Sequence, residues 1–256
     1  MSQIANEMNL IDAQEGVANC FPEWVNVEKL DFTNLSVNPN AVDFMITFFP
    51  NRINWSAFSL NPSQKAMDIL RKNPNRINWK HLSQNPSAID IIEANLDKVN
   101  WEALSKNSSA MHILEKNIDK INPVWISTNE GAMDFLQKNP EFIRWHWMCL
   151  NPSPVAIDLL EQNIDNVYWM FLSRNPSAMR ILEKHPDKIN WCHLSINPSA
   201  VHLLRVAPKR LVHKGELCKN PKAMDMIETI AMEKSTDIDW ENLSLNPAIF
   251  IQTSAE

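Results

Sequence analysis

Glycine is rare in this sequence. Only three of the 256 residues are glycine: Gly16, Gly131 and Gly215. Loops that cradle phosphate groups need several glycines at fixed offsets, because the backbone must approach the phosphate closely. The sequence also lacks a Gly-x-Ser-x-Gly turn, which would present a serine nucleophile. We therefore expect no nucleotide site, no cofactor and no enzymatic activity.

Basic residues are outnumbered, and long apolar runs are missing. The chain carries 24 Lys and Arg against 30 Asp and Glu, a formal net charge of -6. Binding to DNA, RNA or an anionic membrane would need a basic face, so the charge argues against all three. No apolar run reaches the roughly 18 residues of a membrane span, and the first residues do not form a signal peptide. The composition predicts a soluble chain in a reducing, intracellular compartment.

The four cysteines do not form a recognisable framework. Cys149 and Cys218 fill a repeat column that is Ser in the other units, so we expect small buried substitutes rather than disulfide partners. Cys192, His193 and His202 could be imagined as metal ligands, but the spacing of a four-ligand zinc site is missing. No metal site is predicted.

One pattern recurs through most of the chain. Its clearest copy runs from Ile189 to Leu204 and has Asn197 near its centre. Equivalent Asn residues follow one another at intervals of 22 to 26 residues, and a fixed period of this length is typical of stacked repeat arrays. The ten anchor residues are Asn38, Asn61, Asn85, Asn107, Asn129, Asn151, Asn175, Asn197, Asn220 and Asn246.

The sequence pattern of each unit predicts two short helices. A Trp six residues before the anchor and a Leu three residues before it, such as Trp79 and Leu82, share one helical face. The Asn directly before that Trp is a good N-cap. The anchor and the Pro after it, such as Asn85 and Pro86, suit the start of a second helix. Because isolated helices this short are marginal in water, stacking must stabilise them.

The predicted fold is all-α: an α-solenoid of about ten two-helix repeats with a period of 22 to 26 residues, over residues 24–256. Residues 1–23 carry no clear unit and are expected to form an N-terminal capping segment. Helices pack about 8 to 10 Å apart, so ten units predict a curved body roughly 80 Å long. Lys214 interrupts the Trp column, and we expect imperfect stacking after about residue 207.

The Trp column is a row of aromatic residues that could stack bases or sugars. Its spacing from the Leu column favours a place in the core instead. Pro123 interrupts the column, and Trp125 is expected to fill the missing place from two positions on.

A second aromatic feature occupies the position two residues after the Trp. There, Trp147 and Phe171 occur in adjacent units, and the apolar Met170 lies beside Phe171. An apolar patch on a repeat protein often marks an interface, and Trp is enriched at such sites. Two interpretations stay open: a protein interface formed by Trp147, Met170 and Phe171, or tighter local packing between units.

Acidic residues recur at one position of the second helix. As a ladder along the stack they could dock a basic partner. We favour the alternative, in which each carboxylate suits the helix dipole and stays solvated, about one screening length from its neighbours. The ladder consists of Asp43, Asp68, Asp90, Asp134, Asp158 and Asp225.

The repeated motif Ile-Asn-Trp-x-x-Leu-Ser-x-Asn-Pro-Ser-Ala, which begins at Ile77 and at Ile189, resembles the Asn/Pro/Trp helical repeats of giant nucleocytoplasmic large DNA viruses. The resemblance covers about residues 24–250 and implies a viral, non-enzymatic chain in the virion or the host cytoplasm. The expected function is a scaffold for protein–protein interaction, as a minor capsid or virion-associated structural protein with capsid proteins among its partners. The alternative is a soluble ankyrin-like adaptor that recruits a host protein.

Overall fold

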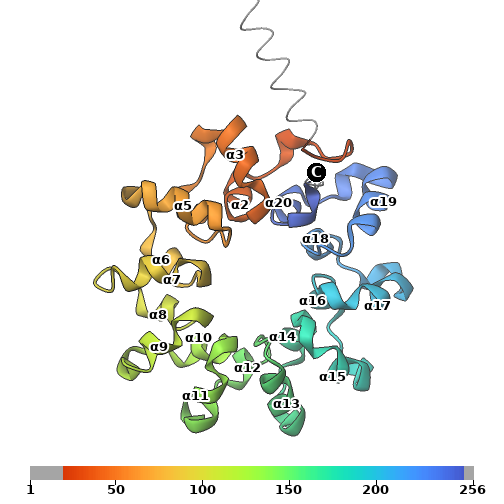
Figure 1. Ribbon diagram of the computed structural model, residues 1–256. Helices are drawn as coiled ribbons and strands as arrows, with labels where there is room; N and C mark the ends of the chain where they lie inside the picture. The colour runs from red at the N-terminus through yellow and green to blue at the C-terminus, as the bar shows by residue number, and fades with distance from the viewer. Residues whose placement is uncertain (1–19, 251–256) are drawn as a thin grey trace, which may run out of the picture.

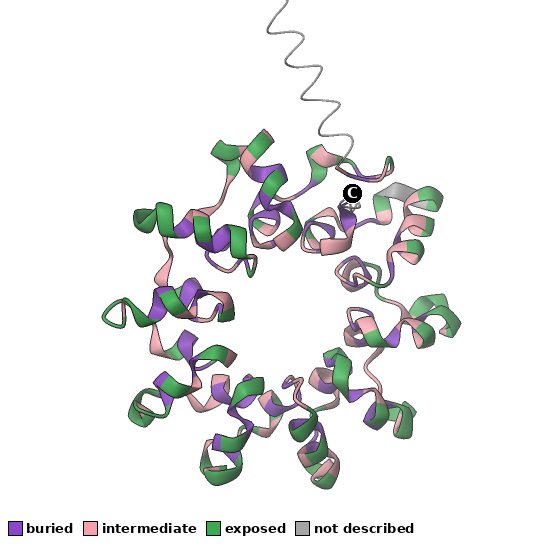
Figure 2. Cartoon of the chain, in the orientation of Figure 1, coloured by how far each residue is buried: buried purple, intermediate pink, exposed green. Residues whose placement is uncertain are grey.

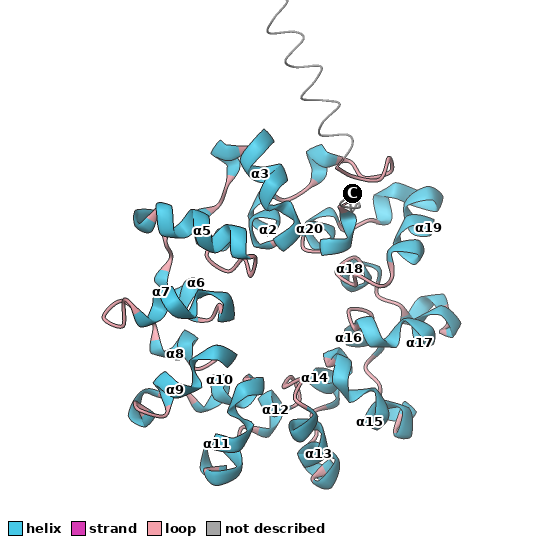
Figure 3. Ribbon diagram, viewed as in Figure 1, coloured by secondary structure: helices cyan, strands magenta, loops and turns pink. Residues whose placement is uncertain are grey.

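A computed structural model describes residues 20–250, and all regular structure in this range is helical. The helices form two concentric layers of a ring (Figure 1, Figure 3). The first helix of each unit lies in the inner layer and the second in the outer layer. The inner helices are α2 (Phe32–Val37), α4 (Trp55–Phe58), α6 (Trp79–Ser83), α8 (Trp101–Leu104), α10 (Pro123–Thr128), α12 (Trp145–Met148), α14 (Trp169–Arg174), α16 (Trp191–Leu194), α18 (Lys214–Leu217) and α20 (Trp240–Ser244).

The outer helices are joined to the inner ones by single turns of 3-10 helix or by short loops. The outer helices are α3 (Val42–Phe48), α5 (Gln64–Lys72), α7 (Ile89–Glu93), α9 (Met111–Leu114), α11 (Met133–Lys138), α13 (Pro154–Gln162), α15 (Met179–Lys184), α17 (Val201–Val206) and α19 (Met224–Lys234). The turns after the anchors are Pro39–Ala41, Pro86–Ala88, Ser108–Ala110, Glu130–Ala132, Pro176–Ala178, Pro198–Ala200 and Pro247–Ile249. The turns before the inner helices are Val27–Lys29, Pro50–Arg52, Pro74–Arg76, Ile118–Lys120, Pro140–Phe142, Ile164–Asn166, Pro186–Lys188, Lys209–Leu211 and Ser235–Asp237.

The anchor Asn residues form the main polar contacts between units. Asn107 is buried, and its Nδ2 donates to the backbone carbonyls of Ser83 at 3.0 Å and Asn85 at 2.9 Å, both in the preceding unit. Its Oδ1 accepts the N–H of Ser109 and so caps the turn that follows. Every polar atom of the carboxamide is therefore used.

The other nine anchors repeat this arrangement. All are at most 2% exposed. In each, Nδ2 donates to two carbonyls of the neighbouring unit, and Oδ1 accepts the N–H two residues on. Among the side chains described in residues 20–233 and 236–250, no buried nitrogen or oxygen lacks a hydrogen-bond partner. The polar groups that a stack of short helices leaves open are thus paired between units.

The same contact closes the ring. Asn38 in the first unit donates to the carbonyls of Ser244 at 3.3 Å and Asn246 at 3.2 Å, at sequence separations of 206 and 208. The backbone N–H of Asp31 donates to the Ser244 hydroxyl at 2.8 Å. Helix α2 packs against α20, as Figure 1 shows. The expected curvature is present, but the expected length of roughly 80 Å along one axis is wrong, because the units turn through a full circle and the last meets the first.

The Ser column adds a second polar link. The Ser83 hydroxyl donates to the carbonyl of Trp79 in its own helix at 2.6 Å and accepts the N–H of Asn100 in the next unit at 2.9 Å. Asn100 in turn caps α8, since its Oδ1 accepts the N–H of Ala103 at 2.8 Å. The predicted N-cap role of the Asn before each Trp is confirmed for α4, α6, α8, α16 and, through Asp239, α20.

The apolar core runs around the ring between the two layers. Every residue of the Leu column is fully buried, whereas the Trp residues of the Trp column are half-buried and pack against the edge of the core. In Figure 2, exposed residues gather on the outer rim. The Leu column comprises Leu35, Phe58, Leu82, Leu104, Ile126, Met148, Leu172, Leu194, Leu217 and Leu243.

Packing changes near Lys214, where imperfect stacking was expected. A pocket of about 230 Å³ opens between α17, α18 and the long helix α19, with Leu204, Leu217 and Ile230 in its wall. The polar links nevertheless continue, since Asn220 keeps both of its contacts to the preceding unit. The irregularity therefore lies in the side-chain packing and leaves the Asn contacts unbroken.

Replacing Asn107 by Ala tests the importance of the anchors. The change removes two hydrogen bonds to buried carbonyls and one turn cap, so we expect the free energy of unfolding to fall by about 2 to 4 kcal/mol. Asn73→Ala is the matched control. Its Nδ2 makes one bond, to the Ile69 carbonyl at an exposed helix end, and its loss is expected to cost under about 1 kcal/mol. Equal losses in urea denaturation would contradict the account.

Candidate protein-binding surface

Aromatic side chains from three adjacent inner helices form a continuous row. The ring centroids of Trp147 in α12 and Phe171 in α14 lie 5.4 Å apart, and those of Trp125 in α10 and Trp147 are also 5.4 Å apart. All three side chains are half-buried, as is Met170 beside Phe171. The predicted neighbours Trp147 and Phe171 thus meet across a junction between units.

Trp125 belongs to this row and does not fill the gap in the Trp column. Its Nε1 donates to the Glu102 carboxylate at 3.0 Å, and Lys106 lies 5.0 Å from its ring centroid. Burial lowers the pKa of the Lys106 ammonium. Two charged side chains of the preceding unit, Glu102 and Lys106, therefore bound the aromatic row at this end.

Tyr168 and His146 extend the row toward the surface. Tyr168 lies 5.1 Å from Phe171 and 4.9 Å from His146 between ring centroids. It is 41% exposed, whereas Trp125, Trp147 and Phe171 are half-buried. One sequence signal marks this residue, because Tyr replaces the usual Asn directly before the Trp of the repeat.

The aromatic row coincides with missing helix caps. Arg144 and Tyr168 stand where other units have a capping Asn, and α12 and α14 have no side-chain bond at their N-caps. A good N-cap stabilises a helix by about 1 kcal/mol. Helices α12 and α14, at two adjacent junctions, therefore lack the stabilisation that an N-cap provides.

Cys149 takes the Ser position beneath these helices. The N–H of Tyr168 donates to its Sγ at 3.2 Å, and Sγ contacts the Trp145 carbonyl at 3.3 Å. Burial raises the pKa of the Cys149 thiol and likewise that of Cys218. Both are free and buried, which confirms the prediction of small buried substitutes.

A second regular feature is a basic side chain placed over the aromatic ring of the preceding unit. We call its place the cation position; it lies three residues before the Trp column of its own unit. Such contacts stabilise by about 0.5 to 1 kcal/mol at exposed sites. The pairs, with distances to the ring centroid, are Lys29 and Trp240 at 5.3 Å, Arg52 and Phe32 at 3.4 Å, Arg76 and Trp55 at 5.5 Å, Lys98 and Trp79 at 5.2 Å, and Lys120 and Trp101 at 4.3 Å.

The other five junctions lack this contact among the described residues. The position holds Phe142 at Pro123, Lys188 at Trp169 and Leu211 at Trp191, and two junctions show what can replace the cation. Where Lys214 replaces the Trp, Asp237 occupies the cation position, and the two form an ion pair at 2.6 Å. Over Trp145 the cation position holds Asn166, and an open pocket of about 480 Å³ lies there. The pocket is lined by residues 143–147 and 165–168.

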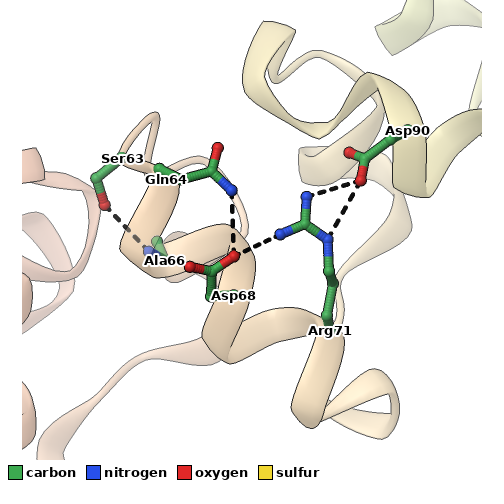
Figure 4. Close-up of polar contacts among 6 residues, drawn as sticks. All are labelled: Ser63, Gln64, Ala66, Asp68, Arg71 and Asp90. Atoms are coloured by element: carbon green, nitrogen blue, oxygen red, sulfur yellow. Dashed lines mark hydrogen bonds and ion pairs between the residues drawn. The ribbon is translucent and has the colours of Figure 1, made fainter.

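The acidic ladder is largely paired. Arg71 in α5 contacts Asp68 on its own helix at 2.6 Å and Asp90 on α7 at 2.7 Å (Figure 4). Asp134 makes no ion pair within residues 20–250. These pairs are exposed, so each contributes little to stability and is weakened by salt. The remaining pairs are Asp43 with Lys65, Asp158 with Arg180, and Asp225 with Arg205.

Over the described part of the chain, no group of three or more His, Cys, Asp or Glu side chains is placed to hold a metal ion. Nor is any helix there long and apolar enough to cross a bilayer. Comparisons of the chain with protein-family models, curated proteins and solved structures find no match.

Arg144→Asn tests whether the missing N-cap of α12 lowers the stability of the protein. The new side chain can cap α12 as Asn100 caps α8, so the free energy of unfolding should rise by about 0.5 to 2 kcal/mol relative to Arg144→Ala. The Ala variant is the control, because it removes the same guanidinium without adding a cap. Equal stability of the two variants in urea denaturation would show that a cap adds nothing here.

Proposed function

We propose that this chain is a non-enzymatic scaffold that binds another protein through the surface formed by α10, α12 and α14. The proposed contact residues are Trp147, Met170 and Phe171, joined by Trp125 and Tyr168. Aromatic rings are enriched at the energetic centres of protein interfaces, where they contribute large contact areas at low conformational cost.

One observation carries this proposal. The two units that carry Trp147 and Phe171 are the same units whose inner helices have no side-chain bond at the N-cap. The Asn hydrogen bonds between units continue on both sides of these helices, so a capping Asn would still fit there. Tighter packing between units would not by itself require the loss of the two caps. Departures from a repeat that reduce stability and cluster in space are expected at functional sites.

The ring itself supports a scaffold function. Stacked repeats with open ends expose apolar faces that must be capped. Here the first and last units cover one another. The aromatic surface and the outer rim of the ring remain free to bind partners. The hydrogen bonds of the anchor Asn residues hold that surface in one arrangement. Preorganised surfaces of this kind reduce the entropic cost of binding.

The repeat resemblance supplies the proposed setting. It favours a minor capsid or virion-associated structural protein that binds capsid proteins, in the virion or the host cytoplasm. An adaptor that recruits a host protein would use the same surface, so the identity of the captured partner separates the two roles.

A photo-reactive amino acid at position 168 tests the surface directly. We expect it to cross-link to one abundant protein of purified virus particles, whereas the same group at the exposed Leu96 gives no specific product. Trp147→Ala combined with Phe171→Ala should reduce the yield at least tenfold, as loss of interface anchors does.

His193→Ala is the matched control, because His193 occupies the corresponding position of the next unit. It should leave the yield unchanged. Circular dichroism should show that all variants keep their helix content. Cross-linking only to a host protein would favour the adaptor, and equal yields from positions 168 and 96 would contradict the proposed surface.

A further inference from the structure

We propose that the pocket over Trp145 binds a lysine or arginine side chain of the partner protein. This proposal rests on the proposed function only for the source of the cation. The chemistry itself comes from a contact that the ring makes elsewhere within its own chain.

Five junctions show what this position normally holds. In each, a Lys or Arg from the connecting turn lies over an aromatic ring of the preceding unit, at 3.4 to 5.5 Å from the centroid. The same contact occurs at the closure of the ring, where Lys29 lies over Trp240. At these five junctions the backbone places this position over the preceding ring. At Trp169 the position holds Lys188, which pairs with Asp187 at 3.6 Å and has no contact with the ring among the described residues.

At Trp145 the aromatic ring is kept and the cation is missing, and the position holds a short polar residue, whereas at Trp191 it holds the apolar Leu211. The connecting turn Ile164–Asn166 has the same 3-10 form as the others, but it ends in the short, neutral Asn166. The Asn166 side chain makes no hydrogen bond within the described residues. The result is the open pocket of about 480 Å³, large enough for the end of a basic side chain.

The pocket wall offers more to a cation than the regular junctions do. Besides Trp145, it contains Trp147, His146 and Tyr168. Several aromatic faces around one site are the usual arrangement for recognition of ammonium groups. Tyr168 is exposed at the mouth, so an incoming side chain can reach the rings from outside.

The charges around the pocket balance. Asp165 lines it and makes no ion pair among the described residues, so its carboxylate is available to a cation. Arg144 also lines the pocket, but its Nη1 donates to the backbone carbonyls of Glu141 at 2.8 Å and Ile143 at 3.1 Å. These bonds hold the guanidinium at the carbonyls of its own turn.

The test uses small probes and the full chain. N-acetyl-arginine methylamide and N-acetyl-lysine methylamide are titrated while the indole N–H signals are followed by NMR. We expect a saturable shift at Trp145 and Trp147. The neutral N-acetyl-norleucine methylamide, of similar length, should produce at most one tenth of that shift.

Two variants make the test specific. Asn166→Lys supplies the missing cation from the chain itself and should abolish the shift. Lys120→Asn removes the cation over Trp101 and should create a second saturable shift at that indole. Loss of the Trp145 response in the first variant with gain of a Trp101 response in the second supports the proposal.

Other outcomes overturn it. An equal shift with norleucine, an unchanged shift in Asn166→Lys, or no shift in the natural chain would each show that the pocket does not select cations. If cross-linking from position 168 is undiminished in Asn166→Lys, the protein interface is supported but the pocket does not bind a cation of the partner. Probe binding with no cross-linked partner would instead support the pocket and contradict the proposed function.

Discussion

The structure depends on the hydrogen-bonding capacity of one side chain. A short carboxamide carries two N–H donors and one acceptor, so Asn can join two carbonyls of one unit and cap a turn in its own. Asp has no donor in its charged form, and Ser has a single one. At each junction the buried backbone carbonyls of one unit are satisfied by the next. Since unpaired buried carbonyls are costly, no unit folds well without its neighbour.

Closure of the ring follows from the same constraint. A chain of such units leaves carbonyls open at one end and an anchor Asn unpaired at the other. When Asn38 meets Ser244 and Asn246, both deficits are removed by one contact. The polar frame then holds the ring together, and side chains outside it can vary. The largest departure from the repeat is the aromatic row of Trp147 and Phe171, whose helices lack caps. We propose that this departure serves binding.

The sequence predicted the local structure well. The period located the ten anchors, and the Asn, Trp and Leu columns predicted the short helices and their N-caps, because these depend on residues a few positions apart. It did not predict the circle. The angle between successive units depends on how side chains pack across each junction, and a small change per unit decides between an open array and a ring. The sequence did not identify Tyr168 and Asn166 as site residues for a similar reason. Both line the pocket over Trp145, and this is evident only from how adjacent turns lie over one another.

The most direct test of this account measures the distance between the first and last units. Single-molecule energy transfer between dyes at positions 33 and 241 would do so, in a variant in which the native cysteines are replaced and Cys149 and Cys218 become the Ser of the repeat. The ring predicts one population of high transfer efficiency, because Asn34 contacts Glu241 across the closure. Asn38→Ala should add a second, open population. A single population of low efficiency, as expected for ends about 80 Å apart, would contradict closure by the anchor contact.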